Sequence, residues 1–475
     1  MNLRLGSASV VITPEKPKGL ALGGYGDRKK YCQGVHDDLY ARIQYFRWGD
    51  HDKSQMILIS LDLIGINSNV LDFFIRRISD RHNVPYDHIV IACTHTHSGF
   101  ESLGVLGPGK LGFTGIFTSR LKTRVLFEMF KKIEGALTIA IKNLTPVIMG
   151  HQQLTLNSLI AINRRKPQRV AVPAINIVKF TTLDGGLVSV IINTPIHATI
   201  LPGSNYLMSA DWIGQFIIRL GNLLADGKVK FQNGTEIFIN FFNGAQGNII
   251  PFKPAYLDIS AENSLRSAKL LTKKKFCADP ASRPENDFAA TKRYGYFLAD
   301  KIGPRITDIE CSPVKEIKFG QSRFLIPLFG VPRGNRLKDV LSHLKNSVSK
   351  SVLLLLLKLE HSVINPFLNL VRKNGNEYIQ GRISAVKIEE LLMITSPGEM
   401  FYEIGQDIRQ RIAKNSLQRE EKILILGLAN DYMSYLFPLA AYYKGGYEPV
   451  FQFAPRAGIL VRRELGKLGL ELVKQ

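Results

Sequence analysis

Two histidines that could bind a metal follow a segment with the composition of a buried strand. The segment 88–94 reads HIVIACT and is followed by His95, Thr96 and His97. In an extended chain, residues two apart share a face, so His95 and His97 can point into one site. Such a pair is a frequent metal or catalytic arrangement, and a purely structural role is the alternative. The pair marks a candidate site that needs further ligands.

Three more strand-like segments end in residues that could join the same site. They are 186–194, leading to His197; 386–395, leading to Glu399 at the start of a helix; and 422–428, leading to Tyr432 and Tyr435. Each has a simpler explanation when taken alone: a lone histidine is usually structural, a glutamate at a helix start is favoured by the helix dipole, and tyrosines often pack. In open α/β sheets, however, ligands bind at the carboxyl ends of strands. Nitrogen and oxygen donors of this kind suit Zn2+ with one exchangeable position for water.

The elements that must position these residues alternate between strand and helix. Residues 55–63, 67–82 and 88–94 have the pattern of a strand, an amphipathic helix and a second strand. Residues 174–182 and 186–194 predict a hairpin, and 211–226, 259–275, 287–302 and 398–413 predict helices. We therefore expect an α/β fold in which a central mixed β-sheet is flanked by helices.

Composition indicates a folded protein with an unusual charge. The chain has 475 residues, 45% of them hydrophobic, and a net charge of +22. A field of that sign favours anionic partners such as nucleic acid or anionic lipid headgroups. No helix-turn-helix, zinc finger or RNP motif is recognisable, so we expect no nucleic acid partner. With no low-complexity linker in the sequence, residues 1–475 are expected to form a single catalytic domain.

The segment 333–373 differs from the rest of the chain. It contains eight Lys and Arg residues against Asp339 and Glu360, and it encloses the leucine run 353–357. One interpretation is a core-packed helix with a solvated basic face. The other is a basic amphipathic insertion or lid that contacts an anionic membrane surface beside the active site.

The termini and cysteines indicate the compartment. The N-terminal sequence MNLRLGSASVVITP lacks the apolar core of a secretory signal, and no run approaches the roughly 20 apolar residues that span a bilayer. The four cysteines are scattered and predict free thiols. These features predict a cytoplasmic protein that can associate peripherally with a membrane.

The order of several motifs resembles that of the neutral/alkaline (non-lysosomal) ceramidase family. The motifs are Gly6 to Thr13-Pro14, Gly24-Tyr25-Gly26-Asp27-Arg28, Val35-His36-Asp37, Thr94-His95-Thr96-His97-Ser98-Gly99, Asn163-Arg164, His197-Ala198-Thr199, Ser209-Ala210-Asp211, Pro397-Gly398-Glu399 and Gly427-Leu428-Ala429-Asn430. The resemblance implies the N-terminal catalytic domain of that family, a zinc-dependent amidohydrolase.

The resemblance also implies roles for individual residues. Zinc would be bound by His95, His197, Glu399 and Tyr435, while His97, Arg164 and Tyr447 would line the reaction centre. Tyr435 is preferred to Tyr432 because its spacing to Tyr442 and Tyr447 resembles the family pattern. The implied reaction is cleavage of an N-acyl amide bond of a lipid by metal-activated water, with His97 as proton shuttle.

Two departures from the family pattern bear on the substrate. The family's Gly-Asp-x-Ser-Pro segment appears here as Gly247-Asn248-Ile249-Ile250-Pro251, and Ile250 has no hydroxyl to act as a nucleophile. The family's characterised members also carry a β-rich C-terminal domain, which we do not expect in this chain. The alternatives are a catalytically inactive lipid-binding relative and an esterase or amidase that acts on a soluble substrate.

Overall fold

The computed structural model describes residues 3–49, 54–105, 107–108, 121–166, 170–226, 237–252, 287–327, 370–373, 376–452 and 454–474. The helix expected over 259–275 lies outside these residues, as does all of the basic segment 333–373 except its last four residues. The lid interpretation therefore stays a prediction.

The first sheet contains the strand that leads to His95. Its order is β5-β4-β3-β1-β6, formed by β1 (Leu3–Val11), β3 (Tyr40–Trp48), β4 (Gln55–Leu61), β5 (Ile89–Cys93) and β6 (Thr145–Pro146). Helix α1 (Ser68–His82) connects β4 to β5, which pair in parallel, so the predicted strand–helix–strand unit is confirmed. Asn67 caps α1 by accepting hydrogen bonds from two backbone N–H groups of its first turn. Helix α2 (Thr123–Lys142) packs on β1 and β3.

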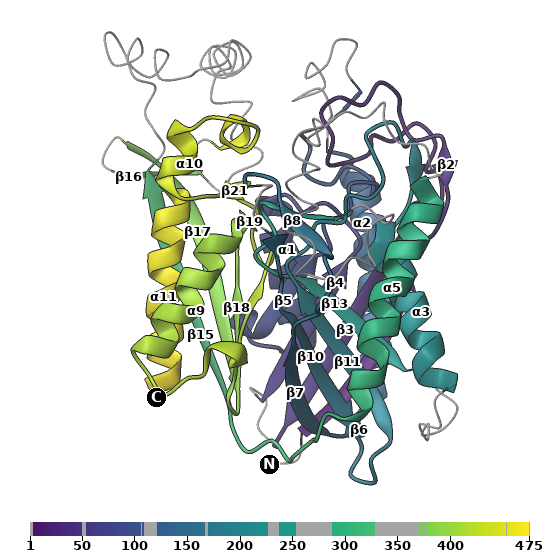
Figure 1. The fold of residues 1–475 in the computed structure, drawn as a ribbon, viewed down its shortest axis with the longest axis vertical. Coiled ribbons are helices and arrows are strands. Elements are labelled where there is room, and N and C mark those ends of the chain that lie inside the picture. Colours follow the sequence, from purple (N-terminus) through teal and green to yellow (C-terminus); the bar gives the residue numbers. More distant parts are fainter. Residues whose placement is uncertain are drawn as a thin grey trace.

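The second sheet leads to His197. Its order is β13-β11-β10-β7, formed by β7 (Ile148–Leu154), β10 (Ile175–Thr181), β11 (Leu187–Thr194) and β13 (Phe238–Asn243). The antiparallel β10–β11 pair confirms the predicted hairpin, and β11 and β13 run in parallel. Helices α3 (Asp211–Asp226) and α5 (Asp287–Thr307) pack against each other on this side of the molecule (Figure 1). Both were expected, although α5 continues past Ile302 and includes Pro304.

The third sheet leads to Glu399 and corrects two boundaries. It contains β15 (Ile317–Pro327), β16 (Leu370–Lys373), β17 (Asn376–Ile388), β18 (Leu391–Thr395) and β20 (Ile423–Leu426). The single strand predicted over 386–395 is wrong, because β17 and β18 form an antiparallel hairpin whose turn contains Glu389 at φ 52°. The helix predicted over 398–413 begins later, as α9 (Tyr402–Lys414), which packs against α11 (Ala457–Lys474).

Short elements complete the fold around the strand ends. They are β2 (Gly34–Val35), η1 (Tyr86–His88), β8 (Ala161–Asn163), β9 (Val170–Ala171), β12 (Leu207–Met208), β14 (Ile249–Pro251), β19 (Glu399–Met400), η5 (Glu420–Lys422), β21 (Tyr435–Leu436), α10 (Leu439–Tyr443) and η6 (Glu448–Phe451). Strands β8, β19 and β21 gather where the sheets meet, in the upper centre of Figure 1. The predicted α/β class with mixed sheets is confirmed, with the strands divided among several sheets.

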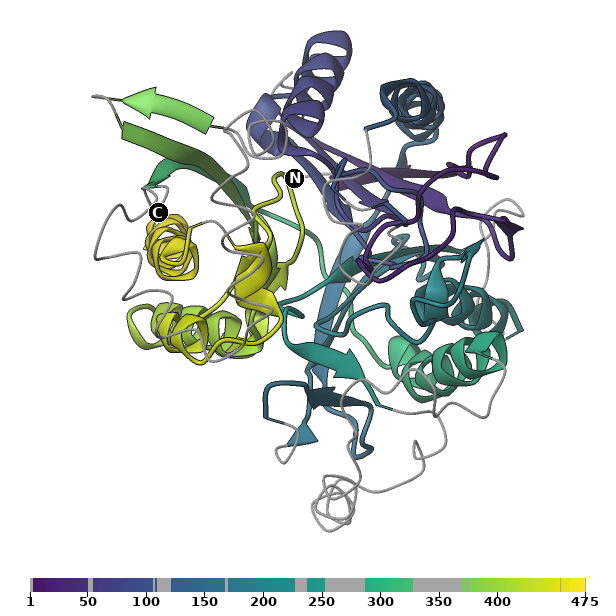
Figure 2. The same cartoon turned by 90° about the horizontal axis from the view of Figure 1, so that it is seen from above.

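Helices surround the sheets on several sides. Seen from above, α9 and α11 lie on one side and α3 with α5 on another (Figure 2). One hydrophobic cluster contains side chains from all three large sheets, among them Phe46, Phe180 and Leu424. Because these buried side chains share one core, the strand ends of the three sheets are held in fixed relation.

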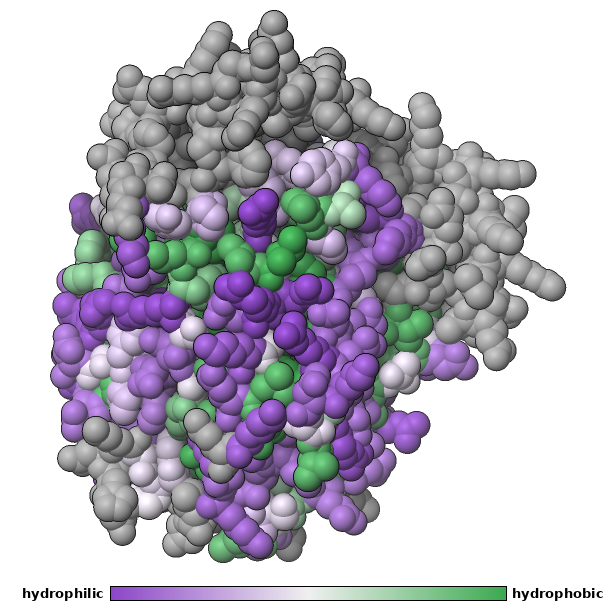
Figure 3. All heavy atoms as spheres, turned by 90° about the vertical axis from the view of Figure 1, so that its left-hand side faces the viewer, coloured by the Kyte–Doolittle hydropathy of each residue, from purple (hydrophilic) through white to green (hydrophobic). Residues whose placement is uncertain are grey.

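The surface formed by α9 and α11 is largely hydrophilic, with hydrophobic residues in a band across its upper part (Figure 3). Ion pairs connect Arg462 with Asp407 and Lys467 with Glu471 there. Within the described residues, no helix combines the length and apolar character needed to cross a membrane.

Asn193 at the end of β11 connects the second and third sheets. Its buried Nδ2 donates to Phe242 O (3.0 Å) and Asn243 O (3.2 Å) of β13 and to Ile425 O (2.9 Å) of β20. A buried carbonyl that loses its donor costs free energy, because no water replaces the lost bond.

We predict that Asn193→Ala lowers the free energy of unfolding by about 1–3 kcal/mol, the usual cost of leaving buried polar groups unpaired. Denaturant titration measures this, with Asn415→Ala as control because the Asn415 side chain donates to a carbonyl at an exposed position. Equal stability losses in the two variants would contradict the role given to Asn193.

Candidate metal centre

His95 follows β5 at a turn that aims its ring inward. Its backbone has φ 67°, a left-handed conformation that few non-glycine residues adopt. The buried ring places Nδ1 2.6 Å from Ile64 O. A carbonyl can only accept, so the neutral ring carries its proton on Nδ1 and leaves Nε2 with a free lone pair. Metal-binding histidines are commonly oriented in this way.

His197 follows β11 and is oriented by the same device. Its Nδ1 lies 2.9 Å from Ile249 O of β14, and its own carbonyl accepts a hydrogen bond from Trp212 Nε1 at 2.9 Å. The ring is fully buried. His197 Nε2 is therefore also a lone-pair donor.

A buried asparagine holds the two histidine segments together. Asn243 Nδ2 donates to Thr94 O (3.1 Å) and to Ile196 O (3.2 Å), the carbonyls that immediately precede His95 and His197. An isolated parallel bridge between Thr96 and Ala198 joins the segments again just beyond the histidines. The ring centroids of His95 and His197 lie 5.0 Å apart as a result.

Glu399 reaches the histidines from the third sheet. Sequence analysis placed it at a helix start, but it lies in β19, whose parallel pairing with β21 sets Glu399 opposite Tyr435. The carboxylate is buried, with Oε2 3.1 Å from His95 Nε2 and 3.3 Å from His197 Nε2. No hydrogen bond is formed by His95 Nε2 within the described residues. The structure thus brings together three of the four predicted zinc ligands.

These three atoms form an arrangement that calls for a cation. Two imidazole lone pairs and a carboxylate oxygen are all acceptors, and acceptors at 3.1–3.3 Å repel one another unless a positive charge lies between them. Nitrogen and carboxylate donors are the ligands that zinc takes in catalytic sites. The residues present therefore fit a zinc ion.

The pKa values in the group reflect how closely its members lie. Burial would raise the pKa of Glu399, but the adjacent His95 and His197 hold its pKa well below the usual range. Burial, with Arg164 and His95 nearby, lowers the pKa of His197 to about 4 despite its contact with Glu399. At neutral pH His197 is neutral, so a proton on this ring does not supply the missing positive charge.

His97 belongs to the same buried cluster. Ligand atoms of His95, His97 and His197 all lie within 4.8 Å of one another, and within the described residues neither ring nitrogen of His97 has a hydrogen-bond partner. Burial and the neighbouring histidines hold the pKa of His97 well below its usual value. The prediction that His97 shuttles protons stays untested, and its position would also allow it to ligate the metal.

Two residues that sequence analysis quoted without a role hold His97. Tyr25 contacts its ring edge-on at a centroid distance of 4.6 Å, and Arg28 Nη2 donates to His97 O at 2.6 Å. Gly24 has φ +94°, and a Cβ at that position would lie 2.3 Å from His97 Cγ. The glycine therefore provides the space that the His97 ring occupies.

Arg164 and the two predicted tyrosines form the other wall of the site. Arg164 donates from Nε to Glu448 Oε1 (2.9 Å) and from Nη2 to Gly247 O (2.7 Å). Its guanidinium lies 5.4 Å from the ring centroid of Tyr435 and 5.6 Å from that of Tyr447. Burial would lower the pKa of Arg164, but Tyr435 and Glu448 raise it, so the group stays charged.

The two tyrosines differ in exposure. Tyr435 is buried, and burial together with Glu399 keeps its pKa well above the usual value. Tyr447 is 38% exposed at the edge of the site, where a substrate could reach it.

Tyr432 contacts the cluster directly, which the sequence spacing did not predict. Its hydroxyl donates to Glu399 Oε1 at 3.1 Å. Sequence analysis considered Tyr432 only as the alternative zinc ligand to Tyr435. The proximity of both tyrosines to one strand end was the available signal, and it did not distinguish their roles.

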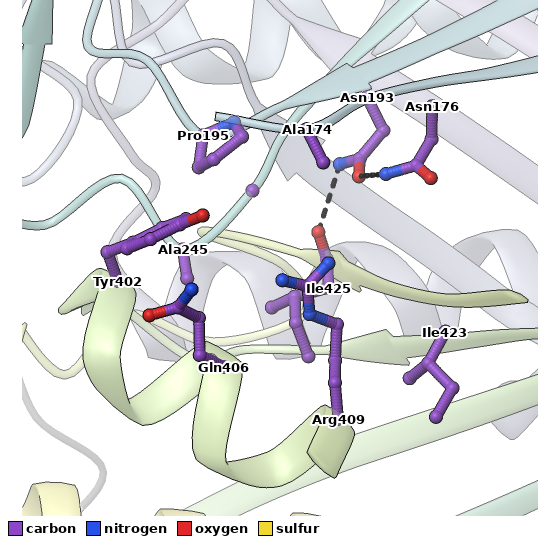
Figure 4. Close-up of a pocket in the computed structure, with 12 residues that line it drawn as sticks. Ala174, Asn176, Asn193, Pro195, Ala245, Tyr402, Gln406, Arg409, Ile423 and Ile425 are labelled. Carbon is purple, nitrogen blue, oxygen red and sulfur yellow. Dashed lines mark hydrogen bonds between the residues drawn. The ribbon is translucent and has the colours of Figure 1, made fainter. Parts of the chain in front are cut away.

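A small cavity lies beside the site without including it. About 340 Å³ of empty space, counted with its opening to solvent, is bordered by Asn193, Pro195, Tyr402, Gln406 and Arg409 among others (Figure 4). None of the candidate site residues lines it. Figure 4 shows Asn193 bonded to Asn176 and Ile425 at its wall, so the cavity marks the junction of the second and third sheets.

Comparison with solved structures identifies the fold. The neutral ceramidase of Pseudomonas aeruginosa superposes with a TM-score of 0.68 at 17% identity, over 100% of this chain and 75% of that one. A structure described as a ceramidase complexed with C2 gives 0.69 at 16%, over 100% and 76%. No protein-family model matches the chain, and the comparison with curated proteins gave no match. The chain therefore has a neutral-ceramidase-like fold, as sequence analysis expected.

We predict that acid destabilises the metal-free protein partly through His197. Its pKa is about 4 in the folded protein and about 6.5 when unfolded, so the unfolded chain binds more protons between these values. The stabilising contribution of neutral His197 is complete above pH 6.5 and is lost as the pH falls towards 4.

The test compares the free energies of unfolding of the wild type and His197→Gln at several pH values in the presence of a chelator. The difference between wild type and variant should shrink as the pH falls from 7 to 4, while the exposed-site control His36→Gln should follow the wild type. A pH-independent difference for His197→Gln would contradict the assignment.

Proposed function

We propose that this protein is a zinc-dependent hydrolase that cleaves the N-acyl amide bond of a lipid. The observation that carries the proposal is the convergence of His95, His197 and Glu399 on one point. The fold adds support, because the similar solved structures are described as ceramidases, proteins named for an N-acylated sphingoid lipid.

The proposed ligands are His95, His197, Glu399 and Tyr435. Bound zinc would supply Lewis acidity, which polarises an acyl carbonyl and lowers the pKa of the attacking water towards neutral. The register pairing of Glu399 with Tyr435 favours their binding the same metal ion.

The remaining site residues transfer protons or stabilise negative charge in the proposed reaction. His97 has unpartnered nitrogens beside the cluster and can take a proton from the attacking water and return it to the leaving amine. Arg164 stays protonated and, with the Tyr447 hydroxyl, can stabilise negative charge on the acyl oxygen. Glu448 and Gly247 O fix the guanidinium, so this stabilisation is preorganised.

The proposed nucleophile is water. Ile250 lies in β14 next to Ile249, whose carbonyl orients His197, and it offers no hydroxyl. A covalent acyl intermediate on residue 250 is therefore excluded, and in the proposed reaction the acyl group passes directly to water.

We predict that the purified wild-type protein contains about one zinc per chain and releases fatty acid from an N-acyl sphingoid lipid. His95→Ala and Glu399→Ala should lose both the metal and turnover, because each removes a ligand of the cluster. Elemental analysis and product detection measure the two properties, with His36→Ala as a matched control at an exposed histidine. Full turnover in a metal-free Glu399→Ala protein would overturn the proposal, and zinc without turnover on any N-acyl lipid would favour a lipid-binding relative.

A second prediction separates proton transfer from metal binding. His97→Gln should retain zinc while lowering kcat by about 10²–10⁴-fold, the usual contribution of a positioned acid–base group. Loss of zinc in His97→Gln would instead assign His97 as a ligand.

A further inference from the structure

One carboxylate of the cluster is held at both of its oxygens. Glu399 Oε2 lies against His95 and His197, whereas Oε1 accepts a hydrogen bond from the Tyr432 hydroxyl at 3.1 Å. A phenol hydroxyl is protonated at neutral pH and donates a single hydrogen. The two oxygens therefore have different surroundings, one facing the nitrogen ligands and one facing a donor.

Tyr432 is itself fixed by contacts that do not involve the cluster. Its backbone N–H donates to Asp431 Oδ1 (2.9 Å) and Ser68 Oγ (3.2 Å), and the Ser68 hydroxyl donates to Tyr432 O at 3.2 Å. Ser68 begins α1, so the tyrosine is anchored to the first helix of the fold. Tyr432 also packs against the hydrophobic cluster that contains Leu61 of β4 and Leu71 of α1.

A glycine leaves room for the ring. A Cβ on Gly65 would lie 2.8 Å from Tyr432 Cδ2 and 3.0 Å from Cε2, closer than carbon atoms approach without displacement. Gly65 O also accepts a hydrogen bond from Ser102 Oγ, so the glycine backbone cannot easily retreat. The position of the tyrosine ring thus depends on the absence of a side chain at residue 65.

We infer that Tyr432 is a positioning residue that commits Glu399 to bind the metal through Oε2 alone. This inference rests on the proposed function. The hydrogen bond blocks Oε1 and fixes the carboxylate rotation, so the oxygen that faces His95 and His197 is already in place before metal binds. The inference also separates the roles of the two neighbouring tyrosines. Tyr435 lies beside Arg164, whereas the hydroxyl of Tyr432 donates to Glu399.

The general energetics of such partners set the expected size of the effect. Groups that hydrogen-bond a metal ligand typically change metal affinity or activity by 10–100-fold when removed. Removal of a ligand itself has a larger effect, because the metal then loses a bond. The magnitude therefore distinguishes positioning from ligation.

The test compares zinc affinity in Tyr432→Phe, Glu399→Gln and the wild type by competition with a chromophoric chelator. Tyr432→Phe keeps the ring and removes only the hydroxyl, and it should weaken zinc binding by about 10–100-fold while Glu399→Gln weakens it further. The melting temperature of the metal-free protein should change little in Tyr432→Phe. Unchanged affinity, or a loss as large as that of Glu399→Gln, would overturn the inference.

Gly65→Ala provides a second variant, since the added methyl would lie closest to the tyrosine ring, 2.8 Å from Cδ2, and would displace it. It should weaken zinc binding in wild type but add little in the Tyr432→Phe background. Equal additional losses in both backgrounds would overturn the inference. The outcomes distinguish the two proposals. Wild-type protein that binds no zinc refutes both the proposed function and the positioning role of Tyr432. Tight zinc binding that is unaffected by Tyr432→Phe refutes the positioning role alone.

Discussion

The electrostatic conflict among His95, His197 and Glu399 is the constraint on which the site depends. Each histidine donates a hydrogen bond from Nδ1–H to a backbone carbonyl, so two lone pairs and a carboxylate oxygen face each other in a buried space. Such a cluster is costly without a cation, because low-dielectric surroundings strengthen repulsion between acceptors. The fold holds this arrangement in place, and a metal ion relieves it.

The cluster exists only where the three sheets meet. His95 follows the first sheet, His197 the second and Glu399 the third, so the site forms when their shared core is assembled. Buried asparagines make the connections. Asn243 joins the two histidine segments, and Asn430 donates from Nδ2 to Ile89 O and accepts at Oδ1 from Ile91 N–H. Left-handed backbone at His95, Asn430 and Ser434 shows that the chain accepts local strain around this junction.

The sequence predicts the regular elements better than it predicts the junction. The unit of β4, α1 and β5 is read from hydrophobic spacing because each element buries one face over several residues. Glu399 was misplaced because β19 is a two-residue strand whose pairing with β21 is set by distant backbone and leaves no periodic pattern. The turn at Glu389 was missed because the apolar residues on either side of it, Ile388 before it and Leu391 after it, were taken to belong to one strand. Tyr432 and Asn243 act through contacts distant in sequence, and only the folded chain shows them.

Anomalous diffraction from crystals of the zinc-supplied protein tests the central claim most directly. Data collected on both sides of the zinc absorption edge locate the ion without assumptions about its ligands. The account predicts a single strong peak about 2.0–2.2 Å from His95 Nε2, His197 Nε2 and Glu399 Oε2, the usual bond lengths for these donors. The absence of a peak at the cluster in protein supplied with zinc, or a peak only at another position, would contradict the proposed metal centre.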